Sequence, residues 1–302
     1  MPRLFNAYIM VDWSAASAPK TGKDSVWIGV MKRDVRFRLT FEAHNPATRE
    51  AGMTILREVL ADLRRRSERA LIGFDFPLGF PRGSVEQLKL NPADWSGLAA
   101  FLAHNVVDKP NNLNNRFAVA AKINRLMTDE PRPFWGCPTN DAQRWLTTTK
   151  PVGEFTDIPP ALRYAEEATK GVTKGGAKSL WQTFGNGTVG GQALVGIPRV
   201  KQLADELGDK AKVWPFQTGW RAQKEADFEG LEAVFAEIYP ALGDVRPEPG
   251  EILDRAQVRA LCEHFAKLDE ADKLGLAFGP QTAQSTDVLD AVEREEGWIL
   301  GL

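Results

Sequence analysis

Short apolar runs separated by polar turns divide the first 75 residues into strands and one helix. Four runs are expected to be strands, at residues 5–12, 24–30, 35–41 and 70–75. The two outer runs are continuously apolar, which is typical of strands buried on both faces. The two middle runs flank the polar turn Lys32-Arg33-Asp34, and the second alternates strictly, which predicts an antiparallel hairpin. A helix is expected from about residue 45 to Arg66, so the order is β-β-β-α-β.

The remainder of the chain is expected to be helical, with a brief return to strands. Its expected parts are a mainly helical, loop-rich region at about 84–208, strands at 212–216 and 231–239, and helices at 251–272 and 284–296. This order matches the α/β class, as a ribonuclease H-like mixed sheet with a large helical insertion in a single domain of residues 1–302. In that fold the first and fourth strands are adjacent and parallel at the sheet centre.

Acidic residues stand at unusual places in this pattern. Asp12 ends the first apolar run, Asp75 ends the fourth, and Glu237 lies inside the apolar run at 233–239. A charge at a buried strand is costly unless it is paired or binds a metal. Parallel strands would bring Asp12 and Asp75 together at the carboxyl edge of the sheet, where open α/β sheets bind ligands. We therefore expect these carboxylates to bridge Mg²⁺ or Mn²⁺.

The C-terminal helix offers two further carboxylates. Asp287 and Asp290 are three residues apart, so they share one helix face. If this helix packs beside the first strand, one or both complete the metal site, with Glu237 assisting. All five acidic residues are thus candidate catalytic residues, and four of them are candidate metal ligands.

Each acidic residue also has a plainer interpretation. Asp12 could cap a turn, and Asp75 could simply end its strand. Glu237 could face solvent or pair with an arginine. One of Asp287 and Asp290 could be an ordinary acidic residue favoured near a helix N-terminus. The joint occurrence of these residues in this order favours the metal site.

Composition limits the kinds of site and partner. The two cysteines and three histidines are too few and too far apart for a zinc cluster, so a metal should be held by oxygen. The net charge of −2 gives no global basic surface for nucleic acid, although a local groove remains open. No run approaches the ~20 apolar residues that span a bilayer. There is no signal peptide pattern, so we expect a cytoplasmic protein without membrane partners.

Several polar residues, most of them in the helical region, are candidates for substrate contacts. These candidates are Ser14, Arg116, Arg163 and Lys178, with Lys174 and Arg199 as further phosphate contacts near the glycine-rich stretch at 185–196. Ordinary helix surface is an equally good interpretation of the arginines. The stretch matches G-x-G-x-x-G, but it lacks a good preceding strand, and Pro198 falls in the expected helix. We therefore expect a substrate loop there, not a dinucleotide fingerprint.

Several blocks resemble one family in their order along the chain. They are Val11-Asp12-Trp13-Ser14-Ala15, Ile72-Gly73-Phe74-Asp75-Phe76-Pro77-Leu78-Gly79, Asn115-Arg116-Phe117-Ala118-Val119-Ala120-Ala121, Trp181-Gln182 through Gly196-Ile197-Pro198, Glu237-Ile238-Tyr239-Pro240 and Asp287-Val288-Leu289-Asp290-Ala291. Together they resemble an uncharacterised bacterial family of predicted nucleases, the domain of unknown function 429 type, from about residue 7 to 293. The last block is also similar to the C-terminal helix of Holliday-junction resolvases. The resemblance implies a ribonuclease H fold and a metal site.

These observations favour a Mg²⁺- or Mn²⁺-dependent hydrolase of phosphodiester bonds, acting on nucleic acid or a phosphorylated small molecule. A first alternative is a phosphotransferase of the actin-like and sugar-kinase architecture. That architecture duplicates the fold, and only one β-β-β-α-β unit is visible. A second alternative is a binding protein that has kept the fold without catalysis. The oligomeric state stays open.

Overall fold

The structure is a computed structural model that describes residues 3–36, 38–170, 177–185 and 187–302. Its sheet has six strands in the order β3-β2-β1-β4-β6-β5. The strands are β1 (Ala7–Asp12), β2 (Trp27–Arg33), β3 (Leu39–His44), β4 (Ala70–Phe74), β5 (Ala211–Val213) and β6 (Ala233–Glu237). β1, β2 and β3 pair antiparallel, whereas β4 and β6 continue the sheet in parallel with β1. The expected hairpin and the β1–β4 neighbours are confirmed.

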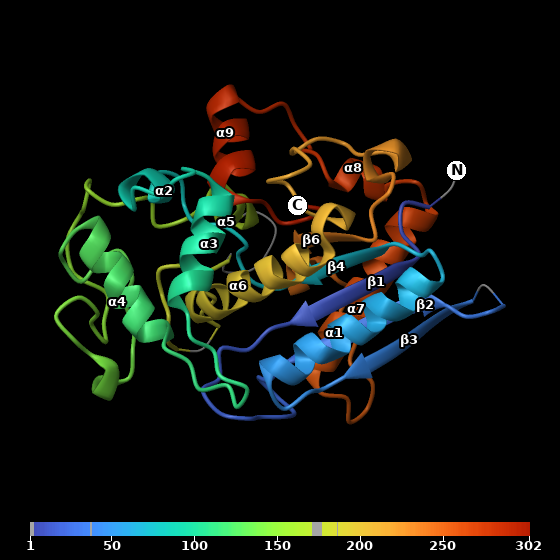
Figure 1. The fold of residues 1–302 in the computed structure, drawn as a ribbon, viewed down its shortest axis with the longest axis horizontal. Helices are drawn as coiled ribbons and strands as arrows, with labels where there is room; N and C mark the ends of the chain where they lie inside the picture. Colours follow the sequence, from blue (N-terminus) through green and yellow to red (C-terminus); the bar gives the residue numbers. More distant parts are fainter. Residues whose placement is uncertain (1–2, 37, 171–176, 186) are drawn as a thin grey trace.

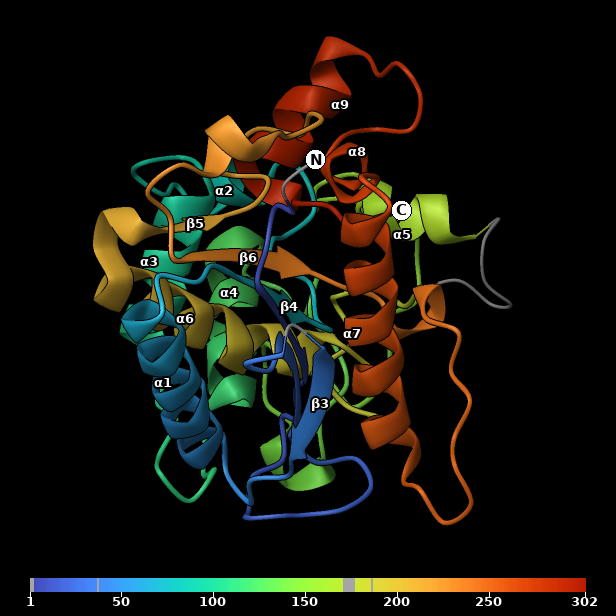
Figure 2. The same ribbon diagram turned by 90° about the vertical axis from the view of Figure 1, so that its right-hand side faces the viewer.

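The helices lie on both sides of this mixed sheet. They are α1 (Arg49–Arg65), α2 (Ser84–Gln87), α3 (Trp95–Asn105), α4 (Arg116–Met127), α5 (Tyr164–Thr169), α6 (Gly190–Leu207), α7 (Leu253–Glu270), α8 (Leu274–Ala277) and α9 (Thr286–Ala291). α1 and α6 cover one face, and α7 covers the other (Figures 1 and 2). The segment between β4 and β5 contains the helices α2 to α6, which are joined by long loops.

Alternation along β1 explains the two cores. Ile9 and Val11 join the cluster on the side of α1 and α6, whereas Tyr8 and Met10 join the cluster on the side of α7. Because successive side chains of a strand point to opposite faces, a continuously apolar strand is buried on both sides. Each helix that borders the sheet therefore has an apolar surface to cover.

Side-chain caps define the start of two helices that the sequence predicts. The Thr48 hydroxyl accepts the N–H of Ala51 at the start of α1, and the Ser285 hydroxyl accepts the N–H of Val288 at the start of α9. Such caps satisfy N–H groups that have no partner within the helix. α9 is shorter than the expected 284–296 helix, because a π-helical turn, Val292–Glu296, replaces its last part.

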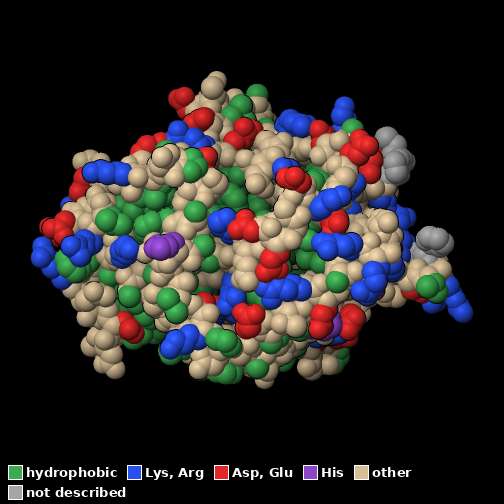
Figure 3. Space-filling model, in the orientation of Figure 1, with side chains coloured by type: hydrophobic (Ala, Val, Ile, Leu, Met, Phe, Trp, Pro, Cys, Tyr) green, Lys and Arg blue, Asp and Glu red, His purple; other side chains and the backbone are tan. Residues whose placement is uncertain are grey.

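The surface agrees with the nearly neutral composition. Acidic and basic side chains are interspersed on the face shown in Figure 3. In the part of the chain that the structure describes, no helix combines the length and apolar character needed to cross a membrane.

Candidate active site

The carboxyl ends of β1, β4 and β6 open into a cleft of about 790 Å³. The cleft is bordered by residues 14–16 after β1, by residues 177–178, 183–185, 187–189 and 191–192, and by the first turn of α7. Its volume suits a small-molecule ligand or part of a larger one. This is the edge at which parallel strands place ligands in open α/β sheets.

Asp12 and Asp75 meet at this edge through the pairing of β1 with β4. Asp12 is the last residue of β1, and Asp75 follows β4 directly. The N–H of Asp75 donates to the carbonyl of Val11 at 3.1 Å, and its carboxylate accepts the N–H of Trp13 at 2.8 Å. The two carboxyl groups lie close enough for each to affect the pKa of the other. The sequence-based expectation that these two residues are neighbours is confirmed.

This carboxyl pair has an unusual charge balance. Burial raises the pKa of Asp12 well above its ordinary value, and the charges of Asp75 and Asp254 raise it further. Burial also raises the pKa of Asp75, to about 7. Two neighbouring buried carboxylates repel each other when both are ionised, so the pair retains a shared proton that Asp12 holds more tightly. Among the described residues, neither carboxyl forms an ion pair with a basic side chain.

A third carboxylate, Asp254, comes from the first turn of α7. It is 6% exposed, borders the same cleft, and accepts the N–H of Asp24 at 2.6 Å. Burial is the main cause of its own raised pKa. Sequence reasoning missed Asp254, because one acidic residue at a helix start is ordinary. The sequence feature that could have indicated Asp254 is the amphipathic helix whose first turn contains it, α7, which packs on β1 and β2.

The structure places Asp287 and Asp290 elsewhere. Both are exposed on α9, away from the ends of β1 and β4 (Figures 1 and 2), and neither borders the cleft. Asp290 instead borders a separate surface pocket together with Asp94 and Glu293. The helix that packs beside β1 is α7, so Asp254 takes the position that we expected these two residues to hold.

Glu237 and Arg163 pair with each other. Two nitrogens of the Arg163 guanidinium donate to the Glu237 carboxylate at 2.8 and 2.6 Å, and the same guanidinium binds Glu166. Glu237 also accepts the N–H of Leu78 at 3.1 Å. Although burial alone would lower the pKa of Arg163, the charges of Glu166 and Glu237 raise it. The alternative that Glu237 pairs with an arginine is therefore what the structure shows. Glu237 and Glu166 border the cleft, whereas Arg163 is fully buried behind them and does not border it.

The other three substrate-contact candidates border the cleft. They are Ser14, Arg116 and Lys178. Ser14 is partly buried directly after the carboxyl pair, and its hydroxyl accepts the N–H of Ala16. Arg199 instead pairs with Asp108 and Glu50, outside the cleft. Lys174 lies outside the described residues.

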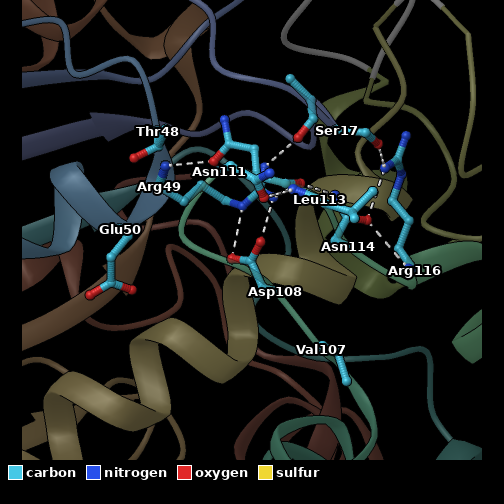
Figure 4. A network of polar contacts seen from close by, with 12 residues as sticks. Ser17, Thr48, Arg49, Glu50, Val107, Asp108, Asn111, Leu113, Asn114 and Arg116 are labelled. Atoms are coloured by element: carbon cyan, nitrogen blue, oxygen red, sulfur yellow. Dashed lines mark hydrogen bonds and ion pairs between the residues drawn. The ribbon is translucent and has the colours of Figure 1, made fainter.

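A buried arginine fixes the chain that follows Asp12. Arg49 is fully buried, and one of its nitrogens donates to the carbonyls of Ser14 and Ala16, each at 2.8 Å. Its charge is balanced by Asp108 at 2.6 Å (Figure 4). The Asn112 side chain accepts the backbone N–H of Arg49. Each nitrogen of the Arg49 guanidinium donates to an acceptor, so this network fixes residues 14–16, which form one wall of the cleft. Nothing in the local pattern of the sequence indicated this role for Arg49.

The glycine-rich stretch is divided between a loop and a helix. Gly185 and Gly187 border the cleft, but α6 starts at Gly190 and continues through Pro198. The expectation of a loop up to residue 196 is therefore wrong for its second half. A proline inside a helix removes one N–H donor, which tertiary packing of this buried helix evidently offsets. No strand directly precedes this stretch in the described chain, so the dinucleotide fingerprint lacks its context. Asn186 lies outside the described residues.

The possible metal ligands are oxygen atoms, and they do not form a closed cage. Among the described residues, no three His, Cys, Asp or Glu side chains are arranged to hold a metal ion as they stand. Comparisons of this chain with protein-family models, with curated proteins and with solved structures gave no match.

Proposed function

We propose that the protein is a divalent-metal-dependent hydrolase of phosphate esters, with phosphodiesters such as nucleic acid as the first substrate class. The observation that carries this proposal is the carboxyl pair of Asp12 and Asp75. It lies at a cleft, shares a proton, and has no basic partner among the described residues. A divalent cation would replace the shared proton and remove the repulsion between two ionised carboxylates.

The residues present fit Mg²⁺ or Mn²⁺. Both are hard cations that prefer oxygen, and Mg²⁺ commonly keeps several waters while one or two carboxylates bind it. Asp12 and Asp75 would hold such an ion directly, and Asp254 would act through a bound water. A site of this kind is completed by the phosphate of its substrate.

In the proposed reaction the ion would activate water, and residues of the chain would hold the ion and shape the cleft. A bound divalent cation would lower the pKa of water and neutralise charge on the phosphate. Asp12 and Asp75 would lose their shared proton when the ion binds and would hold the ion as carboxylates. The N–H of Trp13 orients Asp75. The buried Arg49 network keeps residues 14–16 in place as the cleft wall.

The arrangement of strands supports a ribonuclease H-like fold as part of this proposal. Three antiparallel strands, a helix and a parallel fourth strand beside the first are present, with acidic residues at the ends of β1 and β4. The phosphotransferase alternative would require a second such unit. The described chain contains one six-stranded sheet, which favours the hydrolase.

The shared proton favours one other candidate, a metal-free acid–base pair. Two carboxyl groups with separated pKa values can act as acid and base in hydrolysis. The two candidates differ in their response to a chelator, because an acid–base pair works in the presence of EDTA.

The decisive experiment measures hydrolysis of bis(p-nitrophenyl) phosphate and of a labelled oligonucleotide with Mn²⁺, with Mg²⁺ and with EDTA. We expect metal-dependent cleavage that falls at least 100-fold in Asp12→Asn and in Asp75→Asn. Asp290→Asn, which changes an exposed carboxylate in the same way, is the matched control. Cleavage that persists in EDTA would identify the acid–base pair, and full activity of Asp12→Asn would refute both mechanisms.

A further inference from the structure

The first turn of α6 presents unused N–H donors to the cleft. α6 has 18 residues, and no side chain caps its start at Val189. The N–H of Gly190 donates to Gln182 at 3.2 Å, but the N–H groups of Gly191 and Gln192 have no acceptor among the described residues. Both residues border the cleft. The N-terminus of a helix carries a partial positive charge and favours anions.

A buried cation points at the same turn. Arg116 is 8% exposed, and its Nε has no hydrogen-bond partner among the described atoms. A methyl group added at Gly191 would lie 3.3 Å from this Nε, so the guanidinium contacts the first turn of α6. Its Nη1 is held by two neutral acceptors, Ser17 Oγ and Asn114 Oδ1, each at 2.9 Å (Figure 4).

Arg116 lacks a negative partner. Its neighbour Arg49 pairs with Asp108, whereas Arg116 forms no ion pair in the part of the chain that the structure describes. Burial and then the charge of Arg49 lower the pKa of Arg116 to about 10, against a weaker opposing effect of Asp141. An unpaired buried charge is costly, and a bound anion would offset that cost.

The same turn also touches the chain beside the carboxyl pair. The Gln192 side chain donates to the carbonyl of Trp13, the residue that follows Asp12. The positive turn and the carboxyl pair therefore border one cleft and are joined by a direct contact. A ligand with a negative group at α6 would reach toward Asp12.

We propose that Arg116 and the first-turn N–H groups of α6 form a binding subsite for a tetrahedral oxyanion, the phosphate group of the substrate. The Arg116 fork and the helix N-terminus bind phosphate oxygens, and this orients the scissile ester toward Asp12 and Asp75. This inference rests on the proposed function, because it names the group that the hydrolase would recognise.

The test uses inorganic phosphate as the probe, with EDTA present so that no metal contributes. Calorimetry on the full chain should show saturable phosphate binding that weakens at least tenfold in Arg116→Gln. Arg125→Gln is the matched control, because Arg125 is exposed on the same helix, α4. It should bind phosphate as the unmodified protein does. Equal affinities of the two variants, or no phosphate binding by the unmodified protein, would overturn the subsite.

Two further variants keep the test decisive. If Arg116→Gln does not fold, Gly191→Ala places a methyl group 2.9 Å from the Thr183 carbonyl oxygen and 3.3 Å from the Arg116 Nε, so the first turn of α6 must shift away from both and phosphate binding should also weaken. Unchanged affinity in a folded Gly191→Ala variant would refute the subsite. Asp12→Asn should bind phosphate as well as or better than the unmodified protein, since a negative charge is removed. Phosphate binding without metal-dependent cleavage would therefore refute the proposed function while supporting the subsite.

Discussion

The carboxyl groups of Asp12 and Asp75 lie beside each other at the ends of two adjacent parallel strands. The register that pairs Val11 with Phe74 fixes their separation, because each aspartate is the next residue along its strand. Trp13 donates its N–H to Asp75 from the other side. The pairing of β1 with β4 therefore sets the distance between Asp12 and Asp75. Movement of a surface loop could not relieve the repulsion between their two carboxylates when both are ionised.

Stability should fall as the pH rises through the acid range because of Asp75. Its pKa is about 7 in the folded protein, against an ordinary value of 3.8. The folded state therefore binds a proton more tightly, and this stabilisation is lost between about pH 4 and pH 7, with no further loss above. The loss should be on the order of 2–4 kcal/mol. Urea unfolding of the unmodified protein and of Asp75→Asn across pH 4–8 measures it.

The difference between these two proteins isolates Asp75 from other acidic groups with raised pKa values, such as Glu295 and Glu296. Mg²⁺ competes with the protons of the pair, so its apparent affinity should rise with pH through about pH 7, where Asp75 loses its proton, and should continue to rise above it, because Asp12 holds its proton more tightly. Parallel stability curves for the two proteins would show that Asp75 carries no unusual proton.

Asp12→Asn should stabilise the protein and abolish its response to Mg²⁺. The amide keeps the shape of the carboxyl group and stays neutral without binding a proton, whereas burial and the charges of Asp75 and Asp254 make Asp12 costly to ionise. We expect a gain of about 1–2 kcal/mol in the free energy of unfolding at pH 7.5. Melting temperatures with and without 10 mM Mg²⁺ provide the measurement, since an ion that binds only the native state raises the melting temperature. An unfolded variant would identify Asp12 as a structural cap.

Arg163→Met should destabilise the protein strongly. It would leave Glu166 and Glu237 buried without their shared cation, and breaking such a buried pair costs about 3–5 kcal/mol. Arg57→Met is the control, because Arg57 pairs with Glu206 at the surface and should cost about 1 kcal/mol or less. Chemical unfolding of both variants gives the comparison. Similar losses would mean that the Arg163 network contributes no more than a surface pair.

The carboxyl pair was predictable from the sequence, whereas the rest of the site was not. Asp12 and Asp75 each end a continuous apolar run, and the strand order predicts that those runs are neighbours. Asp254 could not be distinguished from any other acidic residue at a helix start, because the choice of α7 as the partner of β1 is tertiary. The Arg163–Glu237 pair joins residues 74 positions apart, which local patterns do not indicate.

The continuation of α6 through Pro198 has a similar cause. Local propensity predicts that a helix ends before a proline, and this lowered the expectation of a helix there. Ala193, Leu194 and Ile197 are fully buried on this helix, so packing against the sheet outweighs one missing hydrogen bond. Only the tertiary structure supplies that compensation, and with it the position of the α6 N-terminus in the cleft.

The choice of α7 over α9 as the source of the third carboxylate gives the sharpest test of the site. Asp254→Asn removes a charge that acts on both Asp12 and Asp75, so it should weaken Mg²⁺ binding about tenfold, as loss of an outer metal contact does. Asp287→Asn and Asp290→Asn change exposed carboxylates on α9 and should alter Mg²⁺ affinity less than twofold. Calorimetric Mg²⁺ titrations at pH 7.5 compare the three variants. If Asp287→Asn or Asp290→Asn lowered the Mg²⁺ affinity more than Asp254→Asn, the third carboxylate would come from α9, and the assignment of Asp254 to the site would be wrong.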